Sequence, residues 1–251
     1  MKKNKDKVLV IIPAYNEEEN IKDVVKAWYP VIEKHHGGGK SRMVVIDDGS
    51  KDSTYAILSG LAEKYSMLTV LTKPNSGHGA TLLYGYQYAI QKKADYIFQT
   101  DSDGQTLPEE FEQFWEQRQD YDMVIGHRNK REDGISRVFV TKVLKGVIRA
   151  CFGVIVTDAN TPFRLMKRDV LQKYIGYIPE NYNLSNVLIS VIYAKKGRQV
   201  KYIPITFRPR QGGVNSINFK KIVKIGKGAV RDFKTINKIL ERQGDKFHES
   251  F

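Results

Sequence analysis

Two carboxylates one residue apart are the most chemically suggestive residues of this 251-residue chain. Asp101 and Asp103 follow an apolar run at 95–100 directly, and Gly104 comes next. Side chains alternate along a strand, so residues at i and i+2 point the same way. Two hard oxygen donors there suit Mg²⁺ or Mn²⁺ bound jointly with a ligand diphosphate, because these ions keep open positions for phosphate oxygens. For the pair alone, the competing interpretation is a solvated turn.

Three other segments of polar and glycine residues also follow expected strands directly. They are PAYNE at 13–17, DDGSKD at 47–52 and KPNSG at 73–77. In open sheets of parallel strands, ligands bind beyond the carboxyl ends of the strands. Coincidence explains four such segments in a row poorly, so we expect them to form one site.

Each of these segments also has a purely structural interpretation. A carboxylate in 47–50 could accept hydrogen bonds from a base or ribose, or the segment could be an Asp-Gly turn before a helix capped by Asp52. The segment 75–79 could receive phosphate at a helix start, or be a flexible turn with an N-cap. We expect His78 to be a polar helix-start residue, because no Cys or His lies at metal-ligand spacing from it.

The elements that must position these residues alternate between strand and helix in the first half. Strand patterns lie at 7–13, 42–47, 67–72 and 95–100, and helix patterns at 17–36, 52–65 and 79–92, with Pro30 expected to kink or split the first helix. This alternation predicts an α/β fold with a mostly parallel sheet and helices on both faces. In the second half, helices are expected at 136–152, 168–174, 184–196 and 217–240, and short strands at 123–126, 163–166 and 199–207.

Composition favours one large domain in a reducing compartment. The chain is 41% hydrophobic, and its single cysteine, Cys151, excludes an intramolecular disulfide. No segment has the roughly 18 to 20 uninterrupted apolar residues needed to span a bilayer, and the short apolar run after the N-terminus does not resemble a signal peptide. We therefore expect a cytoplasmic protein.

The charge is distributed very unevenly. Residues 1–125 hold 15 Lys/Arg and 19 Asp/Glu, a net charge of −4, whereas residues 126–251 hold 26 and 9, a net charge of +17. The second half is therefore expected to meet an anionic partner, for which nucleic acid and an anionic membrane surface both qualify.

The joint pattern of motifs resembles family 2 glycosyltransferases, and within them the dolichyl or polyprenyl phosphate sugar synthases. The resemblance covers about residues 7–235 and rests on the segments at 10–17, 45–54, 75–77, 100–105, 126–128, 158–164, 180–184 and 210–216. It implies a glycosyltransferase-A fold, which is a Rossmann-like mostly parallel sheet, with C-terminal amphipathic helices added here. It also implies an inverting, metal-dependent hexosyltransferase that moves a sugar from a UDP- or GDP-linked donor to a polyprenyl phosphate, with Mg²⁺ or Mn²⁺ as cofactor.

The resemblance also implies roles for individual residues. Six of them would contact the nucleotide or support its loop: Pro13, Tyr15, Glu17, Asp47, Asp48 and Asp101. Two would hold the metal: Asp103 and Gln105. Three arginines would bind the acceptor phosphate or the diphosphate: Arg128, Arg137 and Arg210. Those nearest the chemistry would be Asp103, Arg128 and Asp158, with Asp158 either a base or a sugar contact.

The expected domain organisation is a catalytic domain at 1–216 followed by a basic amphipathic helix and tail at 217–251. The nucleotide-binding half would be 7–125 and the acceptor half 126–216. The apolar residues of 217–242 recur at helical spacing beside eight basic ones, so this helix could lie on a membrane or pack on the domain. The segment 136–152 has a similar pattern. Together they predict peripheral association with the inner face of an anionic membrane.

Two competing functions keep some support from the sequence. A soluble glycosyltransferase acting on a glycan or protein would need the basic half only for solubility or oligomerisation. A nucleic-acid-binding protein would explain the basic half, but no zinc, RNA-binding or helix-turn-helix signature supports it, so we expect no nucleic-acid partner. A homo-oligomer and a membrane-protein partner are both compatible with the sequence.

Overall fold

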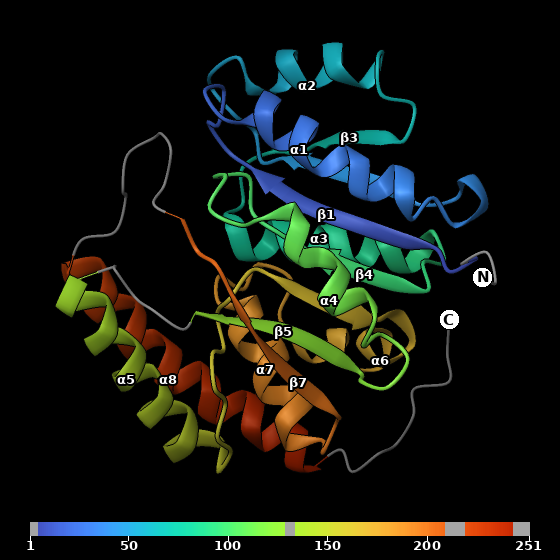
Figure 1. The fold of residues 1–251 in the computed structure, drawn as a ribbon. Coiled ribbons are helices and arrows are strands. Elements are labelled where there is room, and N and C mark those ends of the chain that lie inside the picture. The colour runs from blue at the N-terminus through green and yellow to red at the C-terminus, as the bar shows by residue number, and fades with distance from the viewer. Residues whose placement is uncertain (1–4, 129–133, 209–218, 243–251) are drawn as a thin grey trace.

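The computed structural model describes residues 5–128, 134–208 and 219–242. Their core is a seven-stranded sheet in the order β3-β2-β1-β4-β6-β5-β7 (Figure 1). The strands are β1 (Val8–Ala14), β2 (Arg42–Asp47), β3 (Leu68–Thr72), β4 (Tyr96–Gln99), β5 (Met123–Arg128), β6 (Arg164–Lys167) and β7 (Val200–Ile205). Only β6 in this described sheet runs against the other six. The prediction of a mostly parallel sheet is confirmed.

The strands are apolar on both sides because helices cover both faces of the sheet. Along β1, Leu9 and Ile11 face one core cluster, while Val8, Val10 and Ile12 face the other. The first cluster includes side chains from α3 (His78–Gln91), α5 (Gly134–Phe152), α6 (Arg168–Tyr174), α7 (Ser185–Lys195) and α8 (Phe219–Arg242). The second includes α1 (Ile21–Lys34), α2 (Thr54–Ala62) and α4 (Phe111–Trp115).

The expected helices and strands are all present, with two differences. Pro30 was predicted to kink or split this helix; it lies inside α1, which continues to Lys34, so the helix is not split and the kink stays a prediction. A proline removes one helical hydrogen bond, and the buried residues Trp28, Tyr29 and Ile32 hold the helix on the sheet beside it. The short helix α4 and three 3₁₀ turns, η1 (Gly37–Gly39), η2 (Pro108–Glu110) and η3 (Ile175–Tyr177), were not predicted.

A polar cluster joins α4 to the end of α1. Glu112 contacts Lys34 at 2.8 Å and His35 at 2.6 Å. Burial raises the pKa of Glu112, but its hydrogen bonds with Lys34 and His35 lower it more, so the pKa lies below its ordinary value. The Glu112 carboxylate is therefore more favourable in the folded protein than in the unfolded chain.

Helices α5 and α8 pack side by side at one end of the molecule, far from β3 (Figure 1). Phe152 and Phe233 lie 5.3 Å apart between their ring centroids, and Ile236 and Leu240 are also buried in the core. The apolar stripe of the described half of α8 therefore packs on the domain. Among the described residues, no helix is both long and apolar enough to cross a bilayer.

Candidate active site

Four parallel strands carry the candidate site at their carboxyl ends. Because β1, β2, β3 and β4 are neighbours in register, the segments that follow them meet at one edge of the sheet. Backbone bonds confirm that these segments touch: the amide of Asp48 donates to the Ala14 carbonyl at 2.8 Å. The Lys51 amide donates to the Asn16 side chain at 2.8 Å. The sequence pattern therefore brings the predicted segments together.

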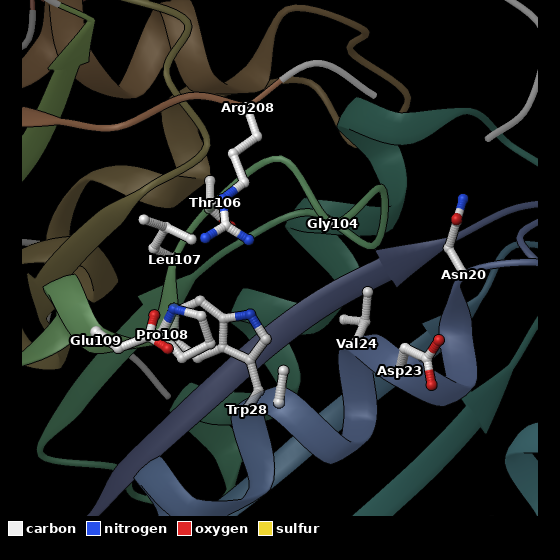
Figure 2. A pocket seen from close by; sticks show the side chains of 11 residues that line it. Asn20, Asp23, Val24, Trp28, Gly104, Thr106, Leu107, Pro108, Glu109 and Arg208 are labelled. Carbon is white, nitrogen blue, oxygen red and sulfur yellow. The ribbon is translucent and has the colours of Figure 1, made fainter. Parts of the chain in front are cut away.

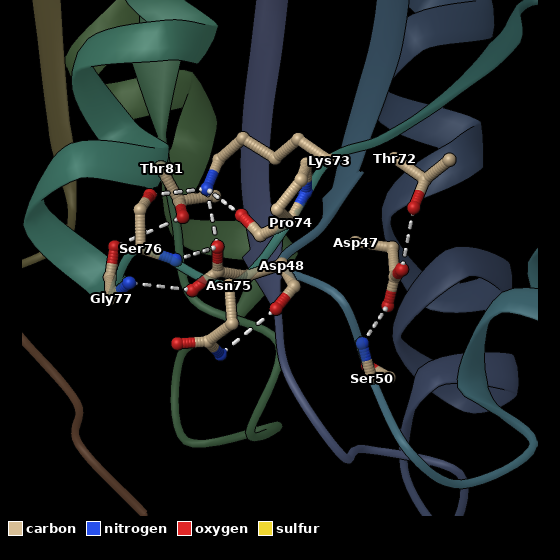
Figure 3. Close-up of polar contacts among 10 residues, drawn as sticks. All are labelled: Asp47, Asp48, Ser50, Thr72, Lys73, Pro74, Asn75, Ser76, Gly77 and Thr81. Carbon is tan, nitrogen blue, oxygen red and sulfur yellow. Dashed lines mark hydrogen bonds and ion pairs between the residues drawn. The ribbon is translucent and has the colours of Figure 1, made fainter.

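The Asp48 carboxylate is buried and holds the segment after β3 (Figure 3). Its oxygens accept hydrogen bonds from the amides of Ser76 and Gly77, both at 2.9 Å, and pair with the ammonium of Lys73. The Asn75 side chain donates to the Asp48 carbonyl at 2.9 Å. Asp48 thus fixes the start of α3 against the end of β2.

Asp47 and Gly49 complete this junction. One Asp47 oxygen accepts the Thr72 hydroxyl at 2.8 Å, and the other accepts the Ser50 amide at 3.2 Å (Figure 3). Gly49 has φ of 66°, and a Cβ there would lie 2.8 Å from the Asn75 amide nitrogen. Only glycine fits both the left-handed backbone and the close approach.

In the segment after β1, Glu17 is buried whereas Tyr15 is exposed. Glu17 is buried and accepts the Asn20 side chain at 2.9 Å, while its amide donates to the Thr54 hydroxyl at 2.8 Å. Tyr15 is 42% exposed and Pro13 is buried in β1. Of the residues predicted for the nucleotide on this strand, Tyr15 is therefore the side chain that offers an open surface to a ligand.

The carboxylate pair after β4 sits in a tight turn. Asp103 accepts the Gln105 amide at 3.2 Å, and Gly104 has φ of 69°. The Gln105 side-chain amide donates to the Arg208 carbonyl at 2.8 Å, and the Arg208 amide donates back to the Gln105 carbonyl at 2.8 Å. These two bonds fasten the turn to the segment that follows β7.

His78 begins α3, which confirms the prediction of a polar helix-start residue, and it also contacts Asp101. The His78 Nε2, in the first turn of α3, lies 3.0 Å from Asp101 Oδ1. Packing lowers the pKa of His78, but Asp101, and more weakly Asp103 and Asp48, raise it more, so the net pKa lies above its ordinary value. The contact between His78 and Asp101 therefore links the segments after β3 and β4, and no sequence motif predicted it.

The residues of the turn after β4 could hold a divalent ion only together with a ligand. In the part of the chain that the structure describes, no group of three or more His, Cys, Asp or Glu side chains could hold a metal ion. Asp101 and Asp103 are partly exposed and offer carboxylate oxygens, and Gln105 offers an amide oxygen. Such an incomplete set of hard donors suits Mg²⁺ or Mn²⁺ with phosphate oxygens in the remaining positions.

A hollow of about 170 Å³ lies on the α1 side of this turn. Figure 2 shows Arg208 above Leu107 and Pro108, with Trp28 beneath. Small-molecule sites usually have about 300 to 1,000 Å³. The hollow is smaller and is not lined by Asp47 or Asp48, so we do not assign the predicted nucleotide site to it.

The acceptor-side residues are only partly described. Asp158 is buried, on the loop before β6. Arg128 ends β5 and Arg137 lies in the first turn of α5, but their side chains lie outside the described residues. Arg210 lies in the segment 209–218, which is also outside them. The structure therefore leaves the predicted arginine cluster as a prediction.

The order of the strands and the position of the site at their carboxyl ends define the fold class of this protein. The helix-covered sheet, with its polar segments at the ends of β1, β2, β3 and β4, has a glycosyltransferase-A-like fold. A crystal structure of glucosyl-3-phosphoglycerate synthase from Mycobacterium tuberculosis with phosphoglyceric acid matches with a TM-score of 0.67 at 16% identity, over 93% of this chain and 80% of that one. The same enzyme with Mn²⁺, UDP-glucose and phosphoglyceric acid matches with a TM-score of 0.66 at 15% identity, over the same shares.

Sequence comparison identifies the family. Residues 9–175 match the family described as glycosyl transferase family 2. An uncharacterized protein of Methanocaldococcus jannaschii is 30% identical over 80% of this chain and 82% of its own length. The chain belongs to glycosyl transferase family 2, and it is a glycosyltransferase.

Two further relatives have names that include a polyprenyl group. Polyprenol monophosphomannose synthase of Mycolicibacterium smegmatis is 27% identical over 86% of this chain and 83% of that protein. Undecaprenyl-phosphate 4-deoxy-4-formamido-L-arabinose transferase of Sodalis glossinidius is 24% identical over 88% of this chain and 65% of that protein. The chain thus spans slightly less than two thirds of the second relative.

Proposed function

We propose that the protein transfers a sugar from a UDP- or GDP-linked donor to a polyprenyl phosphate, assisted by Mg²⁺ or Mn²⁺ and with inversion at the anomeric carbon. The observation that carries this proposal is the Asp101 and Asp103 pair, which stands at the same sheet edge as the junction built by Asp48. The names of two relatives support the acceptor, since both include a polyprenyl group.

On the donor side, each segment has a task that suits its geometry. The open ring of Tyr15 can cover a nucleoside, while Asp48 and Asp47 hold the surrounding backbone rigid. Asp103 and Gln105 would hold the divalent ion at the diphosphate, and Asp101 would contact the nucleotide. When bound, that ion would stabilise the negative charge that develops on the departing diphosphate. His78, at the start of α3, adds positive charge beside the same carboxylates when it is protonated.

On the acceptor side, the attacking group is already an anion. A phosphate near neutral pH needs positioning by cations more than deprotonation by a base. Arg128, Arg137 and Arg210 would provide that positioning, as the resemblance implies. Asp158 is buried and would act either as a base or as a contact to the transferred sugar. An in-line attack on the face opposite the diphosphate inverts the anomeric centre.

The membrane contact follows from the exposed faces of α5 and α8. The described part of α5 exposes Lys142, Lys145 and Arg149, and that of α8 exposes Arg231, Lys234 and Lys238. Because the apolar stripe of α8 packs inward here, we propose an electrostatic contact with an anionic bilayer. In this proposal residues 1–216 form the catalytic domain, and 217–251 helps it to meet the inner face of the membrane.

A donor and acceptor screen tests the proposal. Thermal stabilisation of the protein by UDP and GDP sugars, each with Mn²⁺ or Mg²⁺, would identify the donor. Labelled donor would then be offered to undecaprenyl phosphate in detergent and, separately, to oligosaccharide and protein acceptors. We expect label in the lipid fraction only. Label in the glycan or protein fraction, with none in the lipid, would replace this proposal with the glycan- or protein-directed alternative.

A further inference from the structure

A fully buried arginine lies on β6, next to the strand that leads into the carboxylate pair. Arg164 in β6 is 0% exposed, and among the described residues no other lysine or arginine is buried. It sits directly opposite Gln99 in the antiparallel pairing of β6 with β4. Gln99 comes two residues before Asp101, so this arginine lies on the neighbouring strand, beside the end of β4 that leads into the carboxylate pair.

Hydrogen bonds of the Arg164 guanidinium go to neutral oxygens. Its Nε donates to the Thr161 carbonyl at 3.1 Å, and its Nη2 donates to the Thr161 and Ala159 carbonyls at 2.7 and 3.3 Å. Its Nη1 donates to the Asn186 carbonyl at 3.1 Å and to the Ser190 hydroxyl at 3.4 Å. A planar guanidinium can engage several oxygens in this fixed geometry, which an ammonium cannot reproduce.

Arg164 belongs to a polar layer that also includes Tyr86, Gln99 and Asn186. The Tyr86 hydroxyl on α3 donates to the Gln99 side chain, and it lies 3.5 Å from the Asn186 side-chain oxygen on α7. Asn186 in turn accepts from Arg164 through its backbone. The layer therefore links α3, β4, β6 and α7 within a core that is otherwise apolar.

Stability alone does not explain a charge in this place. Removing an arginine from water is costly, and apolar replacements of buried ionic groups are often neutral or stabilising. Burial lowers the pKa of Arg164, and nearby tyrosines together with Asp158 and Asp101 raise it less. What the guanidinium does hold is the loop at 158–163, through two of its carbonyls.

We propose that Arg164 is a positioning residue, which fixes the 158–163 loop and the acid Asp158 on it against β4, the strand that leads into Asp101. This inference rests on the proposed function, because it gives the loop a place in sugar transfer. The acceptor-side acid lies on the loop, and the diphosphate-side carboxylates follow β4. Displacement of such groups by about 1 Å can slow a reaction by about 100-fold.

Two conservative variants and one control test the catalytic part. Arg164→Lys keeps the positive charge but loses the planar guanidinium and its several donors, and Tyr86→Phe removes one hydroxyl. Arg168→Lys is the matched control, since Arg168 begins α6 and donates to the Ala94 carbonyl away from the layer. In the full chain, with the nucleotide sugar from the donor screen, Mn²⁺ and undecaprenyl phosphate, we expect kcat for Arg164→Lys to fall at least tenfold with the donor KM within threefold. Tyr86→Phe should show a smaller fall of the same kind, and Arg168→Lys should match the wild type. An unchanged kcat for Arg164→Lys, or a fall matched by the control, would overturn the inference.

Hydrogen exchange tests the loop independently of any activity. In Arg164→Lys, backbone amides in 158–163 should exchange at least tenfold faster, while those of β1 and β2 keep wild-type rates. Wild-type exchange in the loop would refute its dependence on Arg164. Failure of the wild-type protein to transfer sugar to undecaprenyl phosphate would refute the proposed function, and the exchange rates would still decide whether Arg164 fixes the loop.

Discussion

Asp48 and Asp101 should respond oppositely to the same substitution, although the sequence offers both as ligand-binding carboxylates. The buried carboxylate of Asp48 accepts two backbone amides and pairs with Lys73. In Asp48→Asn one carboxylate oxygen becomes an amide NH2 group that faces another hydrogen-bond donor, so one hydrogen bond is lost and Lys73 loses its counter-charge. A hydrogen bond that involves a charged group contributes about 1.5 to 3 kcal/mol.

The loss should be visible in thermal unfolding. Taking about 3 kcal/mol in total, and about 2 to 4 °C per kcal/mol for a chain of this size, we expect Asp48→Asn to lower Tm by about 6 to 12 °C. Asp101→Asn is the matched control, since Asp101 is 25% exposed and its contact is with the half-exposed His78. Exposed pairs contribute about 0 to 1 kcal/mol, so its Tm should fall by less than about 4 °C.

Differential scanning calorimetry of both variants at pH 7.5 without ligand decides the matter. The two melting points should be well separated, with Asp101→Asn near the wild type. Equal melting points, or a lower one for Asp101→Asn, would show that Asp48 does not hold the junction of β2 with α3.

Three further predictions concern packing, pH and lipid. A Cβ at Gly79 would lie 2.6 Å from the Asn183 carbonyl, so Gly79→Ala should destabilise by about 1 to 3 kcal/mol, while Gly60→Ala, with open space around it, should be neutral or stabilising in urea unfolding. Equal effects would contradict the close packing. The pKa of Glu112 lies below its ordinary value of 4.5, so its contribution should be present above about pH 4.5 and lost as the pH falls further. The Tm difference between wild type and Glu112→Gln should therefore shrink below that pH; a constant difference would exclude the electrostatic cause. Sedimentation with vesicles containing phosphatidylglycerol should show binding that 0.5 M NaCl weakens, and equal binding to neutral vesicles would argue against the basic faces of α5 and α8.

Local signals in the sequence predicted most of the fold. Apolar runs bounded by glycine or charge placed β2 and α6 at their observed residues. The five-residue helix α4 is too short to show a helical period. Its aromatic residues would be equally compatible with a buried loop. The antiparallel direction of β6 was also hidden, because an apolar segment of four residues carries no information on strand direction.

The site was predictable to the extent that strand ends meet in a parallel sheet. The positions of Asp48 and Asp101 followed from that rule. Their partners did not, because Lys73 and His78 reach them across 25 and 23 residues of sequence. Arg164 was noticed only as part of a motif, since nothing local shows that a charged side chain will be buried among backbone carbonyls.

Transfer of labelled sugar to undecaprenyl phosphate by wild type and Asp103→Asn is the most direct test of the proposed reaction. The assay would use the donor that stabilises the protein best, with Mn²⁺ present or removed by EDTA, and Asp120→Asn as a surface control. We predict label in the lipid for wild type and control with Mn²⁺, and a loss of at least 100-fold for Asp103→Asn and for EDTA, with an unchanged melting point for the variant. Full transfer by Asp103→Asn, or by the wild type in EDTA, would contradict the metal-assisted transfer proposed for this site.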